Sequence, residues 1–197
     1  MRITVFGAFG SVGRRVVEEA RRRGHEVTAV SRRARAGAEV GDARVVADVV
    51  RLGAASDLVI SATRPGDGAE GELVETARAL LAGAARTGVR LLLVGGAATL
   101  VTPAGHTVEE APDFPDELKA IARACAEQLD VCRADREADW TYLSPPVVLE
   151  PGERTGVFRT GGDEQVGVAI SIEDLAVALV DEAEAPRHRR ARFTVGY

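Results

Sequence analysis

Residues 2–33 limit the possible folds more than any other stretch, because they place glycines between a strand-like run and a helix-like run. The apolar run 3–6 predicts a short strand, and apolar residues at helical spacing after residue 11 predict an amphipathic helix. A second strand is predicted over 26–30, shortly after Gly24. The turn between the first strand and the helix holds Gly7, Gly10 and Gly13. A βαβ unit with glycines at this turn is typical of a dinucleotide-binding site.

Each glycine of the turn has its own expected role. Gly7 permits the tight turn, Gly10 lets backbone N–H groups approach a pyrophosphate, and Gly13 lets the helix pack close to the strands. The positive end of the helix dipole then faces the phosphates. We therefore expect a cofactor to contact the whole turn: Gly7, Ala8, Phe9, Gly10, Ser11, Val12 and Gly13.

Strands and helices alternate along the rest of the chain. Strands are predicted over 43–47, 57–62, 90–94, 140–143 and 193–195. Helices are predicted over 72–86, from Pro115 through Cys132, and from 172 to about 184, the last capped by Ser171. This alternation predicts an α/β fold, a Rossmann-like doubly wound parallel sheet in the order 3-2-1-4-5-6 with a short C-terminal strand and helices on both faces. We expect a single domain over 1–197, with a small substrate-side region from about residue 145.

Composition narrows the classes of partner. The chain has 197 residues, 46% of them hydrophobic, and a net charge of −5, which argues against a nucleic-acid surface. No apolar run reaches the ~18 residues of a membrane span, and Arg2 leads straight into the first strand without a signal-peptide pattern. We expect a cytoplasmic protein, monomer or homodimer, that takes a small-molecule substrate and binds neither nucleic acid nor membrane.

Cysteines and histidines do not point to a metal or a disulfide. Cys125 and Cys132 lie seven residues apart on one predicted helix, about 10 Å along its axis, too far for an unstrained disulfide. The three histidines have no metal-ligand spacing with one another or with the cysteines. We expect no metal site and two small apolar thiols.

The end of the second predicted strand indicates which dinucleotide is bound. An NAD enzyme normally places an acid there to hold the ribose 2′-hydroxyl, whereas this chain has Ser31, Arg32 and Arg33. Arginine offers paired donors and positive charge to a 2′-phosphate, so we predict that NADP(H) is preferred over NAD(H). The alternative is that these are two more surface arginines, since 24 of the 25 basic residues are arginine.

Two further strand ends supply candidate cofactor contacts. Asp48 and Val49 follow the predicted third strand, where the carboxylate is placed to accept from the adenine amine. An ordinary turn aspartate is the alternative there. Small and polar residues also end the fourth strand, where a backbone can approach the middle of the cofactor: Ser61, Ala62 and Thr63.

Several motifs together resemble one family. GAFGSVG (7–13), VSRR (30–33), ISAT (60–63), LLLVGGAATL (91–100) and DWTYLSP (139–145), with the AD at 47–48, resemble the atypical short-chain dehydrogenase/reductases. Within them the chain is similar to the small NAD(P)H-binding group that includes biliverdin reductase B (flavin reductase) and NmrA-like proteins. The resemblance covers essentially the whole chain and implies no particular substrate.

The resemblance implies two catalytic candidates. Thr99 occupies the place of a hydroxyl that faces the nicotinamide at the end of the fifth strand. Lys119, the chain's only lysine, matches the lysine of the Tyr-x-x-x-Lys signature, but Pro115 stands where the tyrosine belongs. Chance retention of Lys119 on a solvated helix face is the alternative.

Two functions remain open at this point. The first is an NADPH-dependent oxidoreductase that transfers hydride to a small flavin, quinone or carbonyl-type substrate. The second is a non-catalytic NADP(H)-binding redox sensor, which the missing tyrosine favours. A nucleotide-sugar epimerase normally needs that tyrosine and a larger substrate domain, and this chain has neither.

Overall fold

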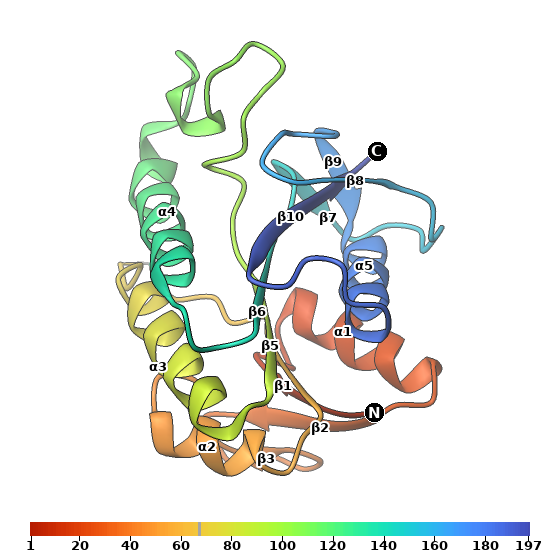
Figure 1. The fold of residues 1–197 in the computed structure, drawn as a ribbon. Helices are drawn as coiled ribbons and strands as arrows, with labels where there is room; N and C mark the ends of the chain where they lie inside the picture. Colours follow the sequence, from red (N-terminus) through yellow and green to blue (C-terminus); the bar gives the residue numbers. More distant parts are fainter. Residues whose placement is uncertain (67) are drawn as a thin grey trace.

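A central sheet organises the structure, a computed structural model that describes residues 1–66 and 68–197 (Figure 1). The described residues form an eight-stranded sheet in the order β3-β2-β1-β4-β5-β6-β10-β8. Its strands are β1 (Arg2–Phe6), β2 (Glu26–Ser31), β3 (Glu39–Val40), β4 (Leu58–Ser61), β5 (Arg90–Val94), β6 (Trp140–Ser144), β8 (Arg159–Gly161) and β10 (Ala191–Gly196). Neighbouring strands run parallel except for the antiparallel pair β10 and β8. The predicted order 3-2-1-4-5-6 with an added C-terminal strand is confirmed.

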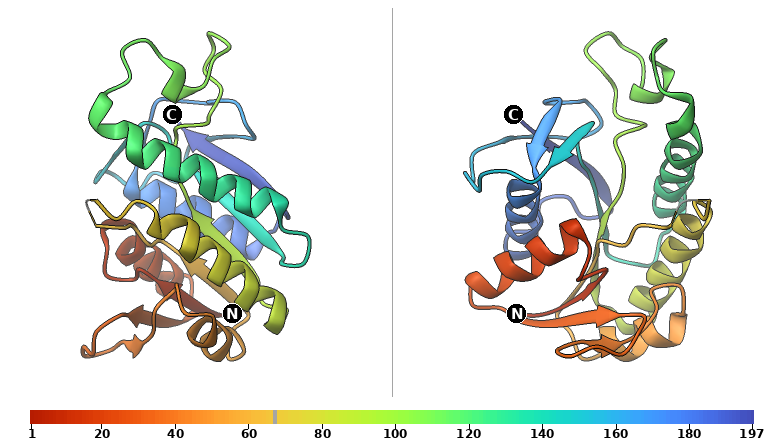
Figure 2. Two further views of the ribbon diagram at one scale, coloured as in Figure 1. Left: turned by 90° about the vertical axis from the view of Figure 1, so that its left-hand side faces the viewer. Right: turned by 180° about the vertical axis from the view of Figure 1, so that it is seen from behind.

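Helices cover both faces of the sheet, as Figure 2 shows from two sides. On one face lie α1 (Ser11–Arg22) and α5 (Ile172–Glu184); on the other lie α2 (Val46–Gly53), α3 (Glu72–Thr87) and α4 (Lys119–Ala134). Successive residues of a strand therefore pack into two different hydrophobic cores, one on each face of the sheet. In β4, Leu58 and Ile60 pack under α1 and α5, whereas Val59 packs with the other helices. Burial on both faces explains why these strands are continuously apolar.

The predicted third strand over 43–47 is wrong. The third strand is instead the two-residue β3, and residues 46–53 form α2. The run of valines has high strand propensity, but Val49 and Leu52 are spaced to bury one face of a helix. Val49 packs against Gly83 of α3, where no Cβ would fit, and this contact stabilises the helix.

The remaining segments cover the carboxyl ends of the strands. Short 3-10 turns, Val108–Glu110 and Asp116–Leu118, lie in the connection between β5 and α4. The helix predicted from Pro115 therefore starts as a 3-10 turn and becomes α-helical at residue 119. Beyond residue 147, β7 (Val148–Glu150) pairs with β9 (Ala169–Ser171) in a separate two-stranded sheet.

Ser171 caps α5, as predicted, and its hydroxyl accepts a hydrogen bond from the Asp174 N–H at 3.0 Å. The Asp174 carboxylate does not complete a capping box. Burial opposes its ionisation, but hydrogen bonds from the Thr155 hydroxyl, the Gly156 N–H and the Tyr197 hydroxyl outweigh burial and lower its pKa. This carboxylate therefore anchors the 151–158 loop and the last residue of the chain.

A second buried acid ties that loop to α1. Glu19 is 5% exposed, and its carboxylate accepts hydrogen bonds from Arg154 at 2.8 Å, Arg22 at 2.8 Å and Arg23 at 2.6 Å. The Arg154 hydrogen bond, with those of the other two guanidiniums, lowers the pKa of Glu19 far below its ordinary value.

In the part of the chain that the structure describes, no helix is long and apolar enough to cross a membrane.

Candidate functional site

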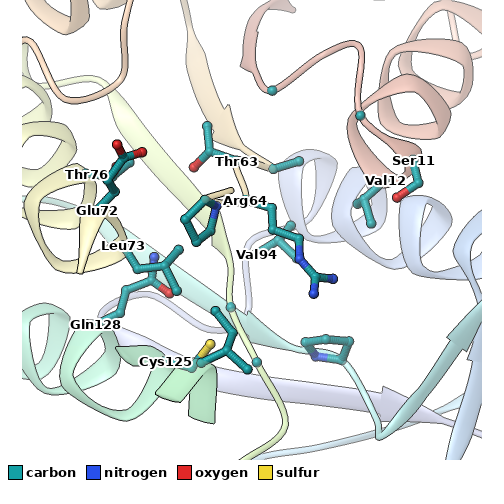
Figure 3. Close-up of a pocket in the computed structure, with 18 of the residues that line it drawn as sticks. Ser11, Val12, Thr63, Arg64, Glu72, Leu73, Thr76, Val94, Cys125 and Gln128 are labelled. Atoms are coloured by element: carbon teal, nitrogen blue, oxygen red, sulfur yellow. The ribbon is translucent and has the colours of Figure 1, made fainter. Parts of the chain in front are cut away.

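A cavity of about 720 Å³ opens at the carboxyl ends of β1, β2, β4 and β5. It contains the switch point between β1 and β4, where the chain order of the sheet reverses and where ligands bind in doubly wound folds. Figure 3 shows it bordered by the turn before α1, by the segment after β4 and by α3 and α4.

The glycine turn is built so that only glycine fits at two positions. Gly7 has a φ of 75°, and a Cβ there would lie 2.7 Å from the Ala62 carbonyl carbon. A Cβ on Gly13 would lie 2.7 Å from the Gly7 carbonyl carbon. Gly10, in contrast, has room, with only the Gly7 oxygen at 3.4 Å. Gly7 and Gly13 thus let β1, β4 and α1 approach one another, while Gly10 faces the cavity.

The N-terminus of α1 is open to an anion. Its N-cap residue, Gly10, provides no side-chain cap, and the first turn carries no acidic residue. The N–H groups of the first turn have no intrahelical acceptor, so they and the helix dipole favour a negatively charged group. This arrangement fits a pyrophosphate.

Most of the predicted turn residues line the cavity: Gly7, Phe9, Gly10, Ser11 and Val12. Ala8 and Gly13 do not; Ala8 is 3% exposed and belongs to the core under α1. The Arg35 guanidinium carbon lies 3.9 Å from the centre of the Phe9 ring, a cation–π contact that brings a further arginine to the edge of the turn.

The structure separates the two arginines after β2. Ser31 and Arg32 line the cavity, whereas Arg33 does not. The backbone N–H of Arg33 instead donates to the Ser31 hydroxyl at 3.3 Å. Only Arg32 of this pair is therefore placed to meet a bound ligand.

Asp48 and Val49 do not reach the cavity. Asp48 lies in α2, where its carboxylate accepts from the Asp42 N–H at 3.0 Å, and Val49 is fully buried. Their expected place is taken by Gly41, Asp42 and Ala43, which line the cavity. Both stretches read as a small residue, aspartate and an apolar residue, and the wrongly predicted strand pointed to the stretch that does not line the cavity.

Asp42 is held rigidly beside the cavity. Arg44 donates to both of its carboxylate oxygens, at 2.9 Å from the backbone N–H and 2.7 Å from Nη2, and reaches Glu72 of α3 at 2.6 Å. The Arg44 side chain is the main cause of the lowered pKa of Asp42. An ionised, anchored carboxylate here suits an acceptor for an amine.

Two of the three residues predicted at the end of β4 line the cavity. Ala62 and Thr63 line the cavity, while Ser61 is buried with its hydroxyl 3.0 Å from that of Thr63. Sequence reasoning missed Arg64 and Pro65, which follow them on the cavity wall. The Arg64 side chain extends into the cavity in Figure 3.

Neither catalytic candidate lines the cavity. The Thr99 hydroxyl accepts a hydrogen bond from Arg192 Nη1 at 2.7 Å, and Arg192 also donates to Asp163. The Lys119 side chain is 63% exposed and forms an ion pair with Asp116 at 2.5 Å. The structure therefore brings Thr99 and Lys119 neither to each other nor to the cavity.

Apart from the glycine turn and the charged side chains of Arg32, Asp42, Arg44, Arg64 and Glu72, the lining of the cavity is mainly apolar. The apolar lining residues include Val94, Val108, Phe114, Leu118, Ile121, Pro145, Pro146, Val147, Leu149 and Ile172. We call this part of the cavity the apolar chamber. Cys125 also lines it, and burial raises the pKa of its thiol to about 11. Among the residues described, no group of three or more His, Cys, Asp or Glu side chains could hold a metal ion.

The profile of a protein family described as NAD(P)H-binding matches residues 7–186. The chain belongs to this NAD(P)H-binding family. YwnB, an uncharacterized protein of Bacillus subtilis, is 37% identical over a match that covers 99% of this chain and 98% of YwnB. The inferred resemblance to the small NAD(P)H-binding atypical short-chain reductases is confirmed.

Two solved structures of similar chains share the NAD(P)H-binding fold over their full length. One, a putative exported protein from Burkholderia pseudomallei, is 38% identical with a TM-score of 0.92 and covers 100% of both chains. The other, a putative NADH-flavin reductase from Streptococcus pneumoniae, is 32% identical with a TM-score of 0.88 and covers 99% of this chain and 98% of that chain.

Proposed function

We propose that this protein is an NADPH-dependent oxidoreductase that reduces a small flavin, quinone or carbonyl-type substrate. The observation that carries the proposal is one cavity that is lined both by the open glycine turn with Arg32 and by the apolar chamber. A cofactor site adjoining an apolar space for a flat substrate is what such a reaction needs. The similarity to a chain described as a putative NADH-flavin reductase supports the same class.

Three parts of the cofactor have a matching group in the chain. The open N-terminus of α1 would bind the pyrophosphate, Ser31 and Arg32 the 2′-phosphate, and Asp42 the adenine amine. NADPH, when bound, supplies a hydride. The protein positions the two ligands and excludes water from the apolar chamber, which strengthens electrostatic interactions inside it.

The positions of Thr99 and Lys119 do not support a role in proton transfer. Arg192 donates a hydrogen bond to the Thr99 hydroxyl, and the exposed Lys119 ammonium forms an ion pair with Asp116. The proton that balances hydride transfer would then come from water or from the substrate itself.

Among residues 1–66 and 68–197, no obvious acid lies on the chamber wall, and this favours the second candidate, a redox sensor that binds NADP(H) without turnover. A single experiment separates the two functions. NADPH absorbance is followed with FMN, menadione and simple ketones as acceptors, alongside direct titration of NADPH binding. Saturable oxidation with any acceptor supports the enzyme. Tight NADPH binding with no oxidation in any of these reactions supports the sensor.

We also propose that the protein acts in the cytoplasm, because an NADPH-dependent reaction draws on the reduced cofactor pool there. We propose that it is a monomer or a homodimer. The description of the Burkholderia pseudomallei relative as exported points the other way. Cell fractionation with antibody detection decides the location, and light scattering of the purified protein decides the oligomeric state.

A further inference from the structure

One buried polar side chain interrupts the wall that α4 contributes to the cavity. The α4 residues on this wall are Ile121, Ala122, Cys125 and Gln128. Gln128 is 2% exposed, and Figure 3 shows it with Leu73 and Cys125 on the side formed by α3 and α4. An uncompensated buried amide is costly, so its partners need to be accounted for.

The oxygen of the Gln128 amide has a partner. Its Oε1 accepts a hydrogen bond from the Tyr142 hydroxyl at 2.9 Å, whereas the alternative acceptor, the Cys125 carbonyl, is 3.3 Å away. Tyr142 is 1% exposed, and burial raises its pKa well above the ordinary value, so it remains a neutral donor. Its ring packs against Gly95, where any Cβ would overlap it. Tyr142 therefore holds the amide in one orientation.

The nitrogen of the same amide has no acceptor among residues 1–66 and 68–197. Because Oε1 is bonded to Tyr142, the two N–H donors are left on the other side of the amide, and the residue borders the cavity. This nitrogen is not one of the fully enclosed polar atoms without a partner, which among the described residues are Arg90 Nε, Trp140 Nε1 and Ser144 Oγ. It is therefore open to the cavity, where a bound group can accept a hydrogen bond from it.

We propose that Gln128 donates a hydrogen bond to a carbonyl-type oxygen of the substrate, with Tyr142 as the residue that positions its amide. This inference rests on the proposed function and narrows it, since it requires an acceptor oxygen on the substrate rather than shape alone. The amide contributes a neutral donor that favours negative charge on the oxygen without giving up a proton. It thereby supplies an electrophilic contact that neither Thr99 nor Lys119 is placed to make.

The test compares two ligands of the same shape. Menadione carries two carbonyl oxygens, and 2-methylnaphthalene carries none. Their dissociation constants are measured by isothermal titration calorimetry, with saturating NADP⁺ so that no turnover occurs. For Gln128→Leu we expect menadione affinity to fall about two- to tenfold, the range of one net hydrogen bond, while 2-methylnaphthalene affinity is unchanged or higher. We expect the melting temperature of the unliganded variant to be unchanged or raised.

Two variants complete the design. Glu127→Leu makes the same kind of change at the adjacent, exposed position of α4 and should leave both affinities as they are. Tyr142→Phe should weaken menadione binding less than Gln128→Leu does, and the double variant should be no weaker than Gln128→Leu alone. This non-additivity would not arise from a purely structural role of Tyr142.

The role of Gln128 and the proposed enzyme activity can each fail without the other. Unchanged menadione affinity in Gln128→Leu, or an equal loss for both ligands together with a lower melting temperature, overturns the role of Gln128. If menadione binds with the expected dependence on Gln128 but is never reduced by NADPH, the assigned contact stands and the proposed enzyme activity fails. If menadione is reduced equally well by Gln128→Leu, the activity stands and the inference fails.

Discussion

Replacing the glycines of the turn one at a time should separate the folding role of this segment from its role in binding. The structure ranks the three positions. Gly10 has an ordinary φ of −74° and room for a methyl group, whereas Gly7 and Gly13 have none. We expect Gly10→Ala to fold and to lose cofactor affinity, and Gly7→Ala and Gly13→Ala to lose stability.

The magnitudes follow from the same geometry. An alanine at position 7 must adopt the left-handed region, which costs about 1–2 kcal/mol, and must also displace the backbone around Ala62, which adds about 1–3 kcal/mol. A total of about 2–5 kcal/mol lowers the melting temperature of a chain of this size by about 4–20 °C. Gly13→Ala lacks the left-handed penalty and should fall in the lower part of that range. Gly10→Ala replaces an N-cap glycine and should cost no more than about 1 kcal/mol.

The assay pairs thermal unfolding with titration of NADPH fluorescence at a temperature where all variants are folded. Gly10→Ala should bind NADPH at least about tenfold more weakly, since a methyl group on Gly10 would occupy space needed by the pyrophosphate. If Gly10→Ala binds NADPH as tightly as the unmodified protein, the pyrophosphate does not lie against this turn. If Gly13→Ala keeps its melting temperature, the close approach of α1 to β1 is not what requires glycine.

Four further results are expected. Arg32→Ala should weaken NADPH binding about tenfold or more and NADH binding little, whereas the matched Arg33→Ala should change neither; equal losses in both variants would contradict the placement of Arg32. Glu19→Gln should cost about 1–3 kcal/mol of unfolding free energy at pH 7, measured by urea denaturation. Because the pKa of Glu19 is lowered in the folded state, its contribution is present above the unfolded value of about 4.3 and is lost as the pH falls below it, so the gap to the variant should close in acid. Lys119→Ala should leave NADPH affinity and turnover unchanged; a loss of turnover at constant affinity would restore its catalytic role. Alkylation of Cys125 by iodoacetamide should be slow at pH 7 and accelerate up to a pH of about 11; fast labelling at neutral pH would show that burial does not control this thiol.

The sheet and the glycine turn could be predicted because their patterns are local. Glycine spacing at 7, 10 and 13 and short runs of apolar residues report directly on a turn and on strands covered on both faces. The failure at 43–47 arose from neighbours far along the chain. The valines there were assigned by strand propensity, while the contact between Val49 and Gly83 of α3 made the segment a helix.

The hydrogen bonds of Thr99 and Gln128 could not be predicted for the same reason, because their partners lie on other elements of the fold. Thr99 matches a local motif, but Arg192, which engages its hydroxyl, lies 93 residues later and carries no signal in that motif. Gln128 stands in an ordinary helical stripe, and its oxygen is taken by Tyr142 of a strand that follows the helix. Contacts of this kind depend on how elements pack, so they emerge only with the fold.

Titration of the unmodified protein with NADPH and with NADH tests the assignment of the cofactor site most directly. Both dissociation constants are measured by the cofactor's own fluorescence, in one buffer at one salt concentration. With Arg32 holding the 2′-phosphate through charge-assisted hydrogen bonds, NADPH should bind about tenfold or more tightly than NADH. Equal or tighter binding of NADH would contradict this assignment.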